Sequence, residues 1–315
     1  MQALVIQPAF LGDVVLATPL VESLSSAGYV VDMVVRGGNE SLLANNPNIE
    51  RLLIWEKRNG KYANLWSLLK RIRETKYDLI VNPHRYASSG LLTVLSQAKT
   101  TVGFRQNPFS GLFTHRINHQ FGDGTHEVDR NLDLLGKVGI SGTRLPRLYP
   151  SEDDFAAADA NSPYITIAPA SVWFTKRYPA EKWAELIKKL PNNLEVHLIG
   201  AAGDRELCEA IQVLAGKTCK VRAGEQNLLQ SAALMAGAQM NYVNDSAPLH
   251  LASAMRAPVT AFFLNTTPNF GFGPVNANGM VRETVQKLSC KPCGMTGKRT
   301  CPEGHFKCSE INPEP

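Results

Sequence analysis

The sequence lacks the features that define several large classes of protein. No apolar run approaches the ~18–20 uninterrupted residues that a membrane-spanning helix needs. The chain has no Lys/Arg-rich start, and residues 4–6 suit a β-strand better than a signal peptide, so we expect a cytoplasmic protein. The sequence also contains neither a GxGxxG dinucleotide fingerprint nor a GxxxxGK[ST] phosphate loop, which argues against dehydrogenases and P-loop enzymes.

Positively charged residues are only slightly more numerous than negatively charged ones. The 33 Lys and Arg residues outnumber 28 Asp and Glu, and this net charge of +5 does not by itself indicate nucleic acid. Seven of the basic residues lie between Lys57 and Lys76. The favoured interpretation is the solvated face of a helix. The alternative is a basic surface for an anionic acceptor or for the phosphate-rich face of a membrane.

Apolar runs alternate with amphipathic patterns along most of the chain, which is typical of βαβ units and parallel sheets. With 315 residues, 44% of them hydrophobic, the chain is long enough for about two domains. The expected strands are 3–7, 30–35, 51–55, 78–82, 101–104, 164–168, 195–199, 220–222, 240–244 and 259–263. The expected helices are 13–27, 40–45, 62–75, 89–96, 126–138, 180–190, 204–215, 228–236 and 246–255.

The domain organisation follows from the irregular stretches. Residues 107–124 indicate a loop, and residues 139–162, with several prolines, indicate a linker. We therefore expect an N-terminal domain over residues 1–150, a second domain over 151–289 and a Cys-rich segment over 290–315.

The stretch from Val243 to Ala252 joins an apolar run to a helical pattern with His250 on its second turn. Asp245 or Ser246 can cap that helix, so that backbone N–H groups and the positive dipole end face a ligand. Such a terminus suits a phosphate or diphosphate. The alternative is an ordinary strand–helix junction with a packed histidine.

Two further strand–helix junctions carry charged side chains. Gly12-Asp13 follows the first apolar strand, where ligands are expected in an open α/β sheet. Lys176 and Arg177 follow the strand expected over residues 164–168.

In order and spacing, these junctions resemble the motifs of glycosyltransferase family 9, the ADP-heptose:lipopolysaccharide heptosyltransferases. The matching segments are 11–15 (LGDVV), 175–179 (TKRYP) and 244–250 (NDSAPLH). The resemblance implies an α/β GT-B fold, in which two Rossmann-like domains with parallel sheets face each other across a cleft. It also implies an inverting glycosyltransferase that moves a heptose-type sugar from an ADP-sugar to a lipopolysaccharide core acceptor of the lipid A/Kdo type. Where the family most often has Gly, this chain has Ala247.

Within this resemblance, Asp13 is the candidate base for the acceptor hydroxyl, and Lys176 is the cation that offsets charge developing on the departing diphosphate. A helix cap is the alternative for Asp13, and a surface ion pair is expected for Arg177. Asp204 is either a ribose contact or an N-cap. The donor-binding candidates are Ser171, Thr175, Asp204, Asp245, Ser246, Ala247 and His250.

Basic side chains of the first half are candidates for contact with the carboxylates and phosphates of an inner-core acceptor. Each is individually also consistent with an ordinary surface position. They are Arg58, Lys61, His84, Arg85, Arg105, His126 and Arg130. The expected partners are an ADP-sugar and an anionic glycolipid, with peripheral contact at the inner membrane and no nucleic acid.

Four of the six cysteines cluster as Cys290-x2-Cys293-x7-Cys301-x3-His305-x2-Cys308. In a cytosolic chain such a cluster favours a metal, here a structural zinc ion, before a disulfide. The spacing fits no standard zinc module, so free packed thiols or redox-labile disulfides stay open. No cofactor is expected for catalysis.

Two other functions compete with sugar transfer. A nucleotide-sugar epimerase of the same fold would need several acid/base groups acting on the sugar itself. A non-catalytic nucleotide-sugar-binding protein would not need both Asp13 and Lys176.

Overall fold

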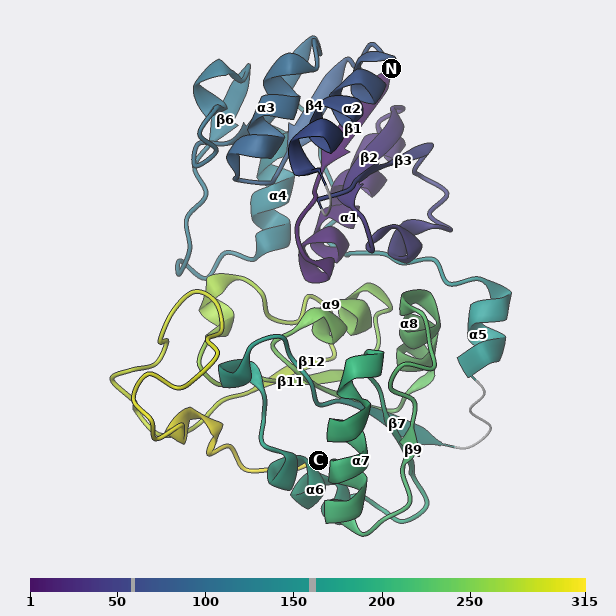
Figure 1. Ribbon diagram of the computed structural model, residues 1–315, viewed down its shortest axis with the longest axis vertical. Helices are drawn as coiled ribbons and strands as arrows, with labels where there is room; N and C mark the ends of the chain where they lie inside the picture. Colours follow the sequence, from purple (N-terminus) through teal and green to yellow (C-terminus); the bar gives the residue numbers. More distant parts are fainter. Residues whose placement is uncertain (58–59, 159–162) are drawn as a thin grey trace. The chain divides into compact units, whose positions relative to one another are not determined.

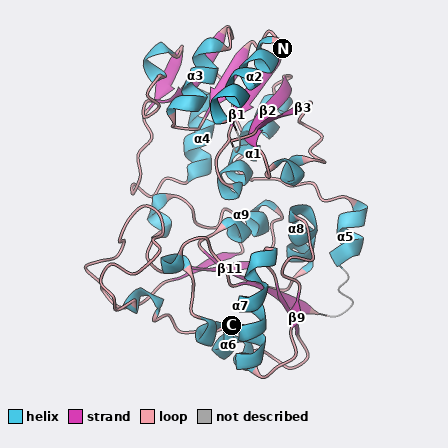
Figure 2. Cartoon of the chain, in the orientation of Figure 1, coloured by secondary structure: helices cyan, strands magenta, loops and turns pink. Residues whose placement is uncertain are grey.

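The computed structural model describes residues 1–57, 60–158 and 163–315. These residues form two compact units, one comprising residues 1–121 and 125–149 and the other residues 122–124 and 150–315. Each unit contains one parallel β-sheet covered by helices (Figures 1 and 2). The expected alternation of strands and helices is therefore confirmed in both halves of the chain.

The described strands of the first unit form a sheet with the order β3-β2-β1-β4-β5-β6, in which every neighbouring pair is parallel. The strands are β1 (Gln2–Ile6), β2 (Val30–Arg36), β3 (Arg51–Trp55), β4 (Leu79–Asn82), β5 (Thr100–Phe104) and β6 (His115–Ile117). The central strands β1 and β4 are buried almost throughout. Helices on both faces of a parallel sheet account for their continuous apolar sequences.

Four helices complete the described part of the first unit. They are α1 (Leu11–Ser26), α2 (Lys61–Arg73), α3 (Ala87–Leu95) and α4 (Glu127–Gly136), with the short 3-10 turns η1 (Glu40–Leu43) and η2 (Ser110–Leu112). Leu65 and Leu69 of α2 and Leu92 of α3 pack with Leu4 and Trp55 of the sheet. Helix α4 packs against α1, where the Asn131 side-chain amide donates to the carbonyl oxygen of Leu16 at 3.1 Å.

The sheet of the second unit has the order β12-β11-β10-β7-β8-β9 and is also parallel throughout its described strands. The strands are β7 (Tyr164–Ala168), β8 (Glu195–Leu198), β9 (Lys220–Val221), β10 (Asn241–Asn244), β11 (Val259–Phe262) and β12 (Gly279–Arg282). Counted within each unit, both sheets have the doubly wound order 3-2-1-4-5-6. The two halves thus repeat one Rossmann-like topology.

The helices of the second unit cover its sheet in the same manner. They are α5 (Glu152–Ala158), α6 (Ala180–Lys189), α7 (Arg205–Ala215), α8 (Leu228–Gly237) and α9 (Ala247–Ala254), with the 3-10 turns η3 (Phe174–Lys176), η4 (Ala202–Asp204), η5 (Pro268–Phe270) and η6 (Lys307–Ser309). Trp183 of α6 and Ile211 of α7 belong to one buried core, which Cys308 and Ile311 of the C-terminal segment join. The segment from residue 290 onward therefore packs against the second sheet's core.

Strands β6 and β12, the 3-10 turn η2 and helix α5 differ from the sequence-based expectation. Strand β6 and η2 lie within the expected loop. Strand β6 forms because it pairs with β5, and a run of three residues is too short to predict such pairing from the sequence. Strand β12 was not expected either, and it likewise forms by pairing with a neighbour, β11. Helix α5 lies within the expected linker. Its start carries a recognisable signal, since Ser151 and Asp154 exchange side-chain-to-backbone hydrogen bonds as a capping box.

Within the three described ranges, no helix is both long enough and apolar enough to cross a membrane.

Candidate active site

In the first unit, Asp13 lies in the first turn of α1, directly after β1. Strand order reverses between β1 and β4, and such switch points are where ligands bind in open α/β sheets. The residue that precedes the helix is Phe10, so Asp13 does not occupy the N-cap position that the alternative interpretation gave it. The structure thus leaves this carboxylate at the binding edge of the sheet.

The environment of Asp13 opposes its ionisation. Burial and, as a smaller effect, the Glu127 carboxylate raise the pKa of Asp13 to about 6, against the lowering effect of Arg85 and of backbone N–H groups. A carboxylate with this pKa is mostly ionised at neutral pH, yet is a stronger base than an ordinary aspartate. These are the properties that a general base requires.

A buried charged network surrounds this position. Glu127 accepts from the ring of His119 at 2.8 Å and from the Arg130 guanidinium at 3.0 Å. Burial disfavours the charged form of Glu127, but these two partners outweigh burial and lower its pKa. Glu127 therefore stays charged, while the positive charge of Arg85, whose guanidinium lies 4.5 Å from the centre of the Phe121 ring, lowers the pKa of Asp13.

In the second unit, Lys176 and Asp245 form an ion pair of 2.6 Å between Nζ and Oδ2. Lys176 follows β7 and Asp245 follows β10, and these adjacent strands mark the switch point of the second sheet. The Thr266 hydroxyl donates to the same Asp245 oxygen at 2.6 Å. The Lys176 side chain is 17% exposed, so this ion pair is not fully closed off from solvent.

Helix α9 begins beside this pair. Ser246 occupies the N-cap position, and its hydroxyl makes no capping hydrogen bond to the helix. Ala247 is the first helical residue and Pro248 the second. His250 lies on the second turn, buried, with its ring 6.4 Å from that of Phe272. The positive end of a helix, a serine hydroxyl that does not cap the helix and a lysine are thereby brought together.

The other donor-binding candidates lie near this site or are engaged elsewhere. The backbone carbonyl of Ser171 accepts from the Arg177 side chain at 2.6 Å, so Arg177 bonds within its own loop. The Thr175 hydroxyl bonds to the backbone of Lys298, which gives it a structural contact. Asp204 accepts from the backbone N–H of Ala201 at 2.8 Å, the bond expected of a capping residue.

The acceptor candidates of the first unit do not form one cluster. Arg58 lies outside the described residues. Lys61 is exposed at the start of α2, whereas His126 is buried as the N-cap of α4, accepting from the backbone N–H of Val128. Arg105 lines a surface hollow with Arg116 and Lys137. Among the described candidates, Arg85 acts on Asp13 at the start of α1, and His126 and Arg130 lie in the first turns of α4 beside Glu127.

Sequence reasoning missed Glu127 and Thr266 as members of the two sites. In the sequence, Glu127 is followed three residues later by Arg130, a common spacing on a helix that does not by itself indicate a site. The role of Glu127 becomes visible only in the fold, which brings His119 to its carboxylate. Thr266 follows β11 as Asp245 follows β10, so the shared strand edge was the available signal.

Comparison with known proteins agrees with this architecture. The model of the family described as glycosyltransferase family 9 (heptosyltransferase) matches residues 65–306, which excludes Asp13 but includes the whole second site. The lipopolysaccharide heptosyltransferase 3 of Escherichia coli is 28% identical over 279 residues, which cover 81% of each chain.

Two solved structures share the fold. The glycosyl transferase family 9 protein from Veillonella parvula DSM 2008 has a TM-score of 0.80 at 23% identity and covers 89% of this chain and 85% of its own. The E. coli ADP-heptose lps heptosyltransferase II has a TM-score of 0.78 at 23% identity and covers 93% and 96%. The expected GT-B fold of two Rossmann-like domains is confirmed. Because the family model matches most of the chain, this glycosyltransferase belongs to glycosyltransferase family 9, the heptosyltransferase family.

Proposed function

We propose that the chain transfers a heptose-type sugar from an ADP-sugar to a lipopolysaccharide core acceptor of the lipid A/Kdo type, with inversion at the anomeric carbon. The observation that carries the proposal is Asp13, a carboxylate of raised pKa at the switch point of the first sheet. Family membership and the names of the relatives above, which are heptosyltransferases of lipopolysaccharide, support the choice of sugar and acceptor.

The reaction is a single displacement. The acceptor hydroxyl oxygen attacks the anomeric carbon while the bond to the diphosphate oxygen breaks, and ADP leaves with the bonding electron pair. Asp13 takes the hydroxyl proton late in the transition state, which resembles an oxocarbenium ion as in glycoside hydrolysis.

Lys176 and the start of α9 are proposed to hold the diphosphate. The ammonium group of Lys176 offsets the charge that grows on the leaving group, and Asp245 holds that group in position beforehand. The Ser246 hydroxyl, the N–H of Ala247 and the ring of His250 complete the phosphate contacts. Ser171 remains a contact proposed on its position, while Asp204 is proposed for the ribose only in addition to its capping role.

We further propose that the enzyme is cytoplasmic and contacts the inner membrane through α2. Tyr62 and Trp66 of this helix are 74% and 53% exposed. They lie on the helix that also exposes Lys70, Arg71 and Arg73. Aromatic and basic side chains together suit the interface of an anionic membrane. Trp66→Ser should weaken co-sedimentation with anionic vesicles, whereas Val213→Ser, at a more exposed apolar side chain of α7, should not.

The test of function measures ADP release from ADP-heptose with and without a lipid A/Kdo acceptor. We expect release only when acceptor is present, and an epimerase would instead convert the donor without it.

Asp13→Asn should lower kcat by about 10²- to 10⁴-fold and leave donor affinity nearly unchanged. Asp153→Asn, at an exposed aspartate in the first turn of α5, is the matched control. Turnover of Asp13→Asn near that of the wild type would refute the assignment of the base.

A further inference from the structure

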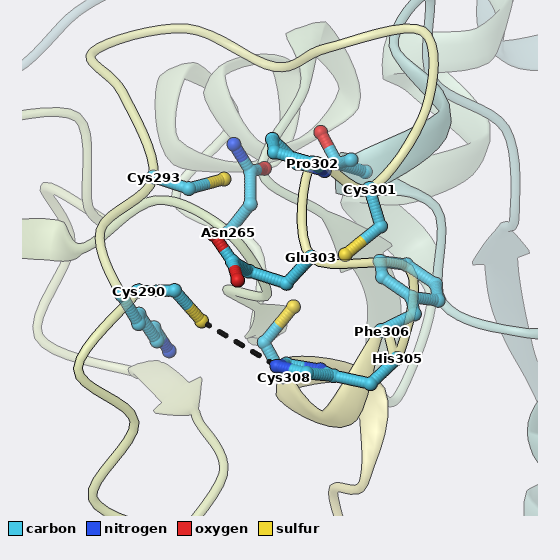
Figure 3. A pocket seen from close by; sticks show the side chains of 11 residues that line it. Asn265, Cys290, Cys293, Cys301, Pro302, Glu303, His305, Phe306 and Cys308 are labelled. Atoms are coloured by element: carbon cyan, nitrogen blue, oxygen red, sulfur yellow. Dashed lines mark hydrogen bonds between the residues drawn. The ribbon is translucent and has the colours of Figure 1, made fainter.

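The C-terminal segment gathers four thiols around one small cavity of the second unit. These residues, Cys290, Cys293, Cys301 and Cys308, are all free cysteines, and they line a cavity of about 10 Å³. Figure 3 shows their sulfur atoms pointing toward a common space. A cavity of this volume holds no more than one water-sized occupant, which excludes an organic ligand.

We propose that these four cysteines bind one thiophilic metal ion, zinc or iron, in a tetrahedral tetrathiolate site. Both ions accept four thiolate ligands, and the C-x2-C spacing of Cys290 and Cys293 is typical of such sites. Over residues 1–57, 60–158 and 163–315, no three His, Cys, Asp or Glu side chains are already spaced as the ligands of one ion. Binding therefore includes rotation of the cysteine side chains, and three of the four are only half-buried.

His305 is assigned outside the ligand set. Its Nδ1 accepts a hydrogen bond from the backbone N–H of Lys307 at 3.0 Å, so the ring proton of the neutral imidazole is on Nε2. This Nε2 lies 3.9 Å from the sulfur of Cys290 and is placed to donate to it. A protonated nitrogen cannot ligate a metal, but it stabilises a metal-bound thiolate. Cys308 is thus the fourth ligand.

The local charge suits a tetrathiolate. Four thiolates and one divalent ion carry a net charge of about −2, and the same segment carries four cationic side chains. These are Lys291, Lys298, Arg299 and Lys307. Glu303, which also lines the cavity, is exposed and offers oxygen atoms, which zinc and iron prefer less than sulfur in such a set.

The segment that the metal would close lies against the loop that carries Lys176. Thr175 and Lys298 exchange backbone and side-chain hydrogen bonds of 2.8–3.3 Å. The rings of Phe174 and Phe306 pack 5.0 Å apart, and Gly297 contacts Trp173. One residue further along, Lys176 forms its ion pair with Asp245.

The segment also contacts the loop that carries Thr266. Cys293 donates its backbone N–H to the carbonyl of Asn265 at 3.1 Å, and the Asn265 amide donates to the carbonyl of Thr296 at 3.2 Å. The metal site would therefore hold in place the two loops that carry Lys176 and Thr266, the side chains that contact Asp245. This second part rests on the proposed function of Lys176, whereas metal binding itself does not.

Elemental analysis of the full chain purified without chelator tests the site and identifies the ion. We expect zinc and iron together to reach about one per chain. Cys301→Ser and Cys308→Ser should fall below about a tenth of that value. Cys219→Ala, at a buried cysteine outside the cluster, and His305→Ala should keep the metal, the latter with about 10- to 100-fold weaker affinity.

Two measurements keep the proposal falsifiable if a serine variant does not fold. Thiol titration of the wild type should show four more reactive cysteines after chelation than before. Wild type with less than about 0.1 metal per chain and unchanged thiol reactivity would overturn the site. Retention of metal by Cys308→Ser together with its loss in His305→Ala would overturn the ligand set.

The coupling to the donor site has its own readout. Chelated enzyme should bind ADP several-fold more weakly, while kcat at saturating donor changes less. Unchanged ADP affinity after complete metal removal would overturn the coupling but leave the metal site intact. Failure of the proposed sugar transfer would alter neither the metal count nor the thiol count, so the two proposals fail separately.

Discussion

At the scale of single residues, the switch point of each sheet holds a charged side chain, an anionic one in the first unit and a cationic one in the second, and the two have different proposed roles. In the first unit a carboxylate, Asp13, is held where burial and Glu127 oppose its charge, and Arg85 offsets this only in part. In the second unit a lysine, Lys176, is held by a buried carboxylate, Asp245. The first arrangement raises basicity, and the second fixes a cation where negative charge develops during transfer.

The raised pKa of Asp13 predicts an acid limb in the rate profile. The base must be deprotonated, so kcat/KM should increase about tenfold per pH unit below about pH 6 and level off above it. Initial rates from about pH 5 to about pH 8 at low donor concentration check this. A limb near pH 4, the ordinary range of aspartate, would contradict the effect of burial on Asp13.

Replacement of Lys176 should affect catalysis more than binding. Lys176→Ala removes a charge that matters most as the diphosphate leaves, so kcat should decrease by about 10²-fold and the dissociation constant of ADP should increase less. The substitution also leaves Asp245 buried and unpaired, so Lys176→Ala/Asp245→Asn is needed as the partner variant. A loss confined to donor affinity, with kcat unchanged, would make Lys176 a uniform binding contact.

The residues that the sequence predicted are those on strand–helix junctions with local signals. Asp13, Lys176, Asp245 and Ser246 follow apolar strands, and the edge of a parallel sheet collects such residues. Glu127 and Thr266 join them only through contacts between elements distant in sequence. Thr175 illustrates the opposite case, because its hydroxyl is engaged by a segment more than one hundred residues away.

At the scale of elements, the strands with continuous apolar sequence were predictable, and the short ones were not. Strands β3 and β7 agree with the expected bounds because both contain an apolar run between turns, fully buried in β7 and partly buried in β3. Strands β6 and β12 lie at the outer edges of their sheets and form by pairing with β5 and β11. Such pairing is tertiary information that a run of three or four residues does not carry.

Gly297 tests whether the C-terminal segment supports the lysine loop. A methyl group at this residue would lie 2.1 Å from Cβ of Trp173, so Gly297→Ala should displace the segment from the loop. We expect a several-fold increase in the donor KM with the protein still folded. Gly136→Ala, at a helical glycine with open space around it, is the control. An unchanged donor KM in Gly297→Ala would show that the loop holds Lys176 without the segment.

At the scale of the whole molecule, the two sheets share one strand order but carry different chemistry. In both sheets parallel strands alternate with helices along the chain, which is why alternation in the sequence predicted the fold class. The assignment of base and cation to different units depends on side chains at equivalent junctions and not on the fold itself. Each unit also has its own buried core, so each should unfold as a separate cooperative transition.

Calorimetry can therefore test whether the base lies in the first unit and the donor-binding groups in the second. At pH 7, ionised Asp13 destabilises the first unit, because its folded pKa of about 6 exceeds the ordinary value of 3.8 and the folded state binds more protons between these values. Stability of that unit should decrease as pH rises from about 4 to about 6. Asp13→Asn should thus unfold a few degrees higher than the wild type at pH 7 and at the same temperature below pH 4.

ADP should act on the other transition. All the groups proposed to hold the diphosphate lie in the second unit, so ADP at about 100 times its dissociation constant should stabilise that unit by about 2.7 kcal/mol. The transition raised by ADP should be distinct from the one raised by Asp13→Asn, and Lys176→Ala should reduce the ADP shift alone. If ADP raised the transition that Asp13→Asn raises, the donor would belong to the first unit, and the roles of the two switch points would be reversed.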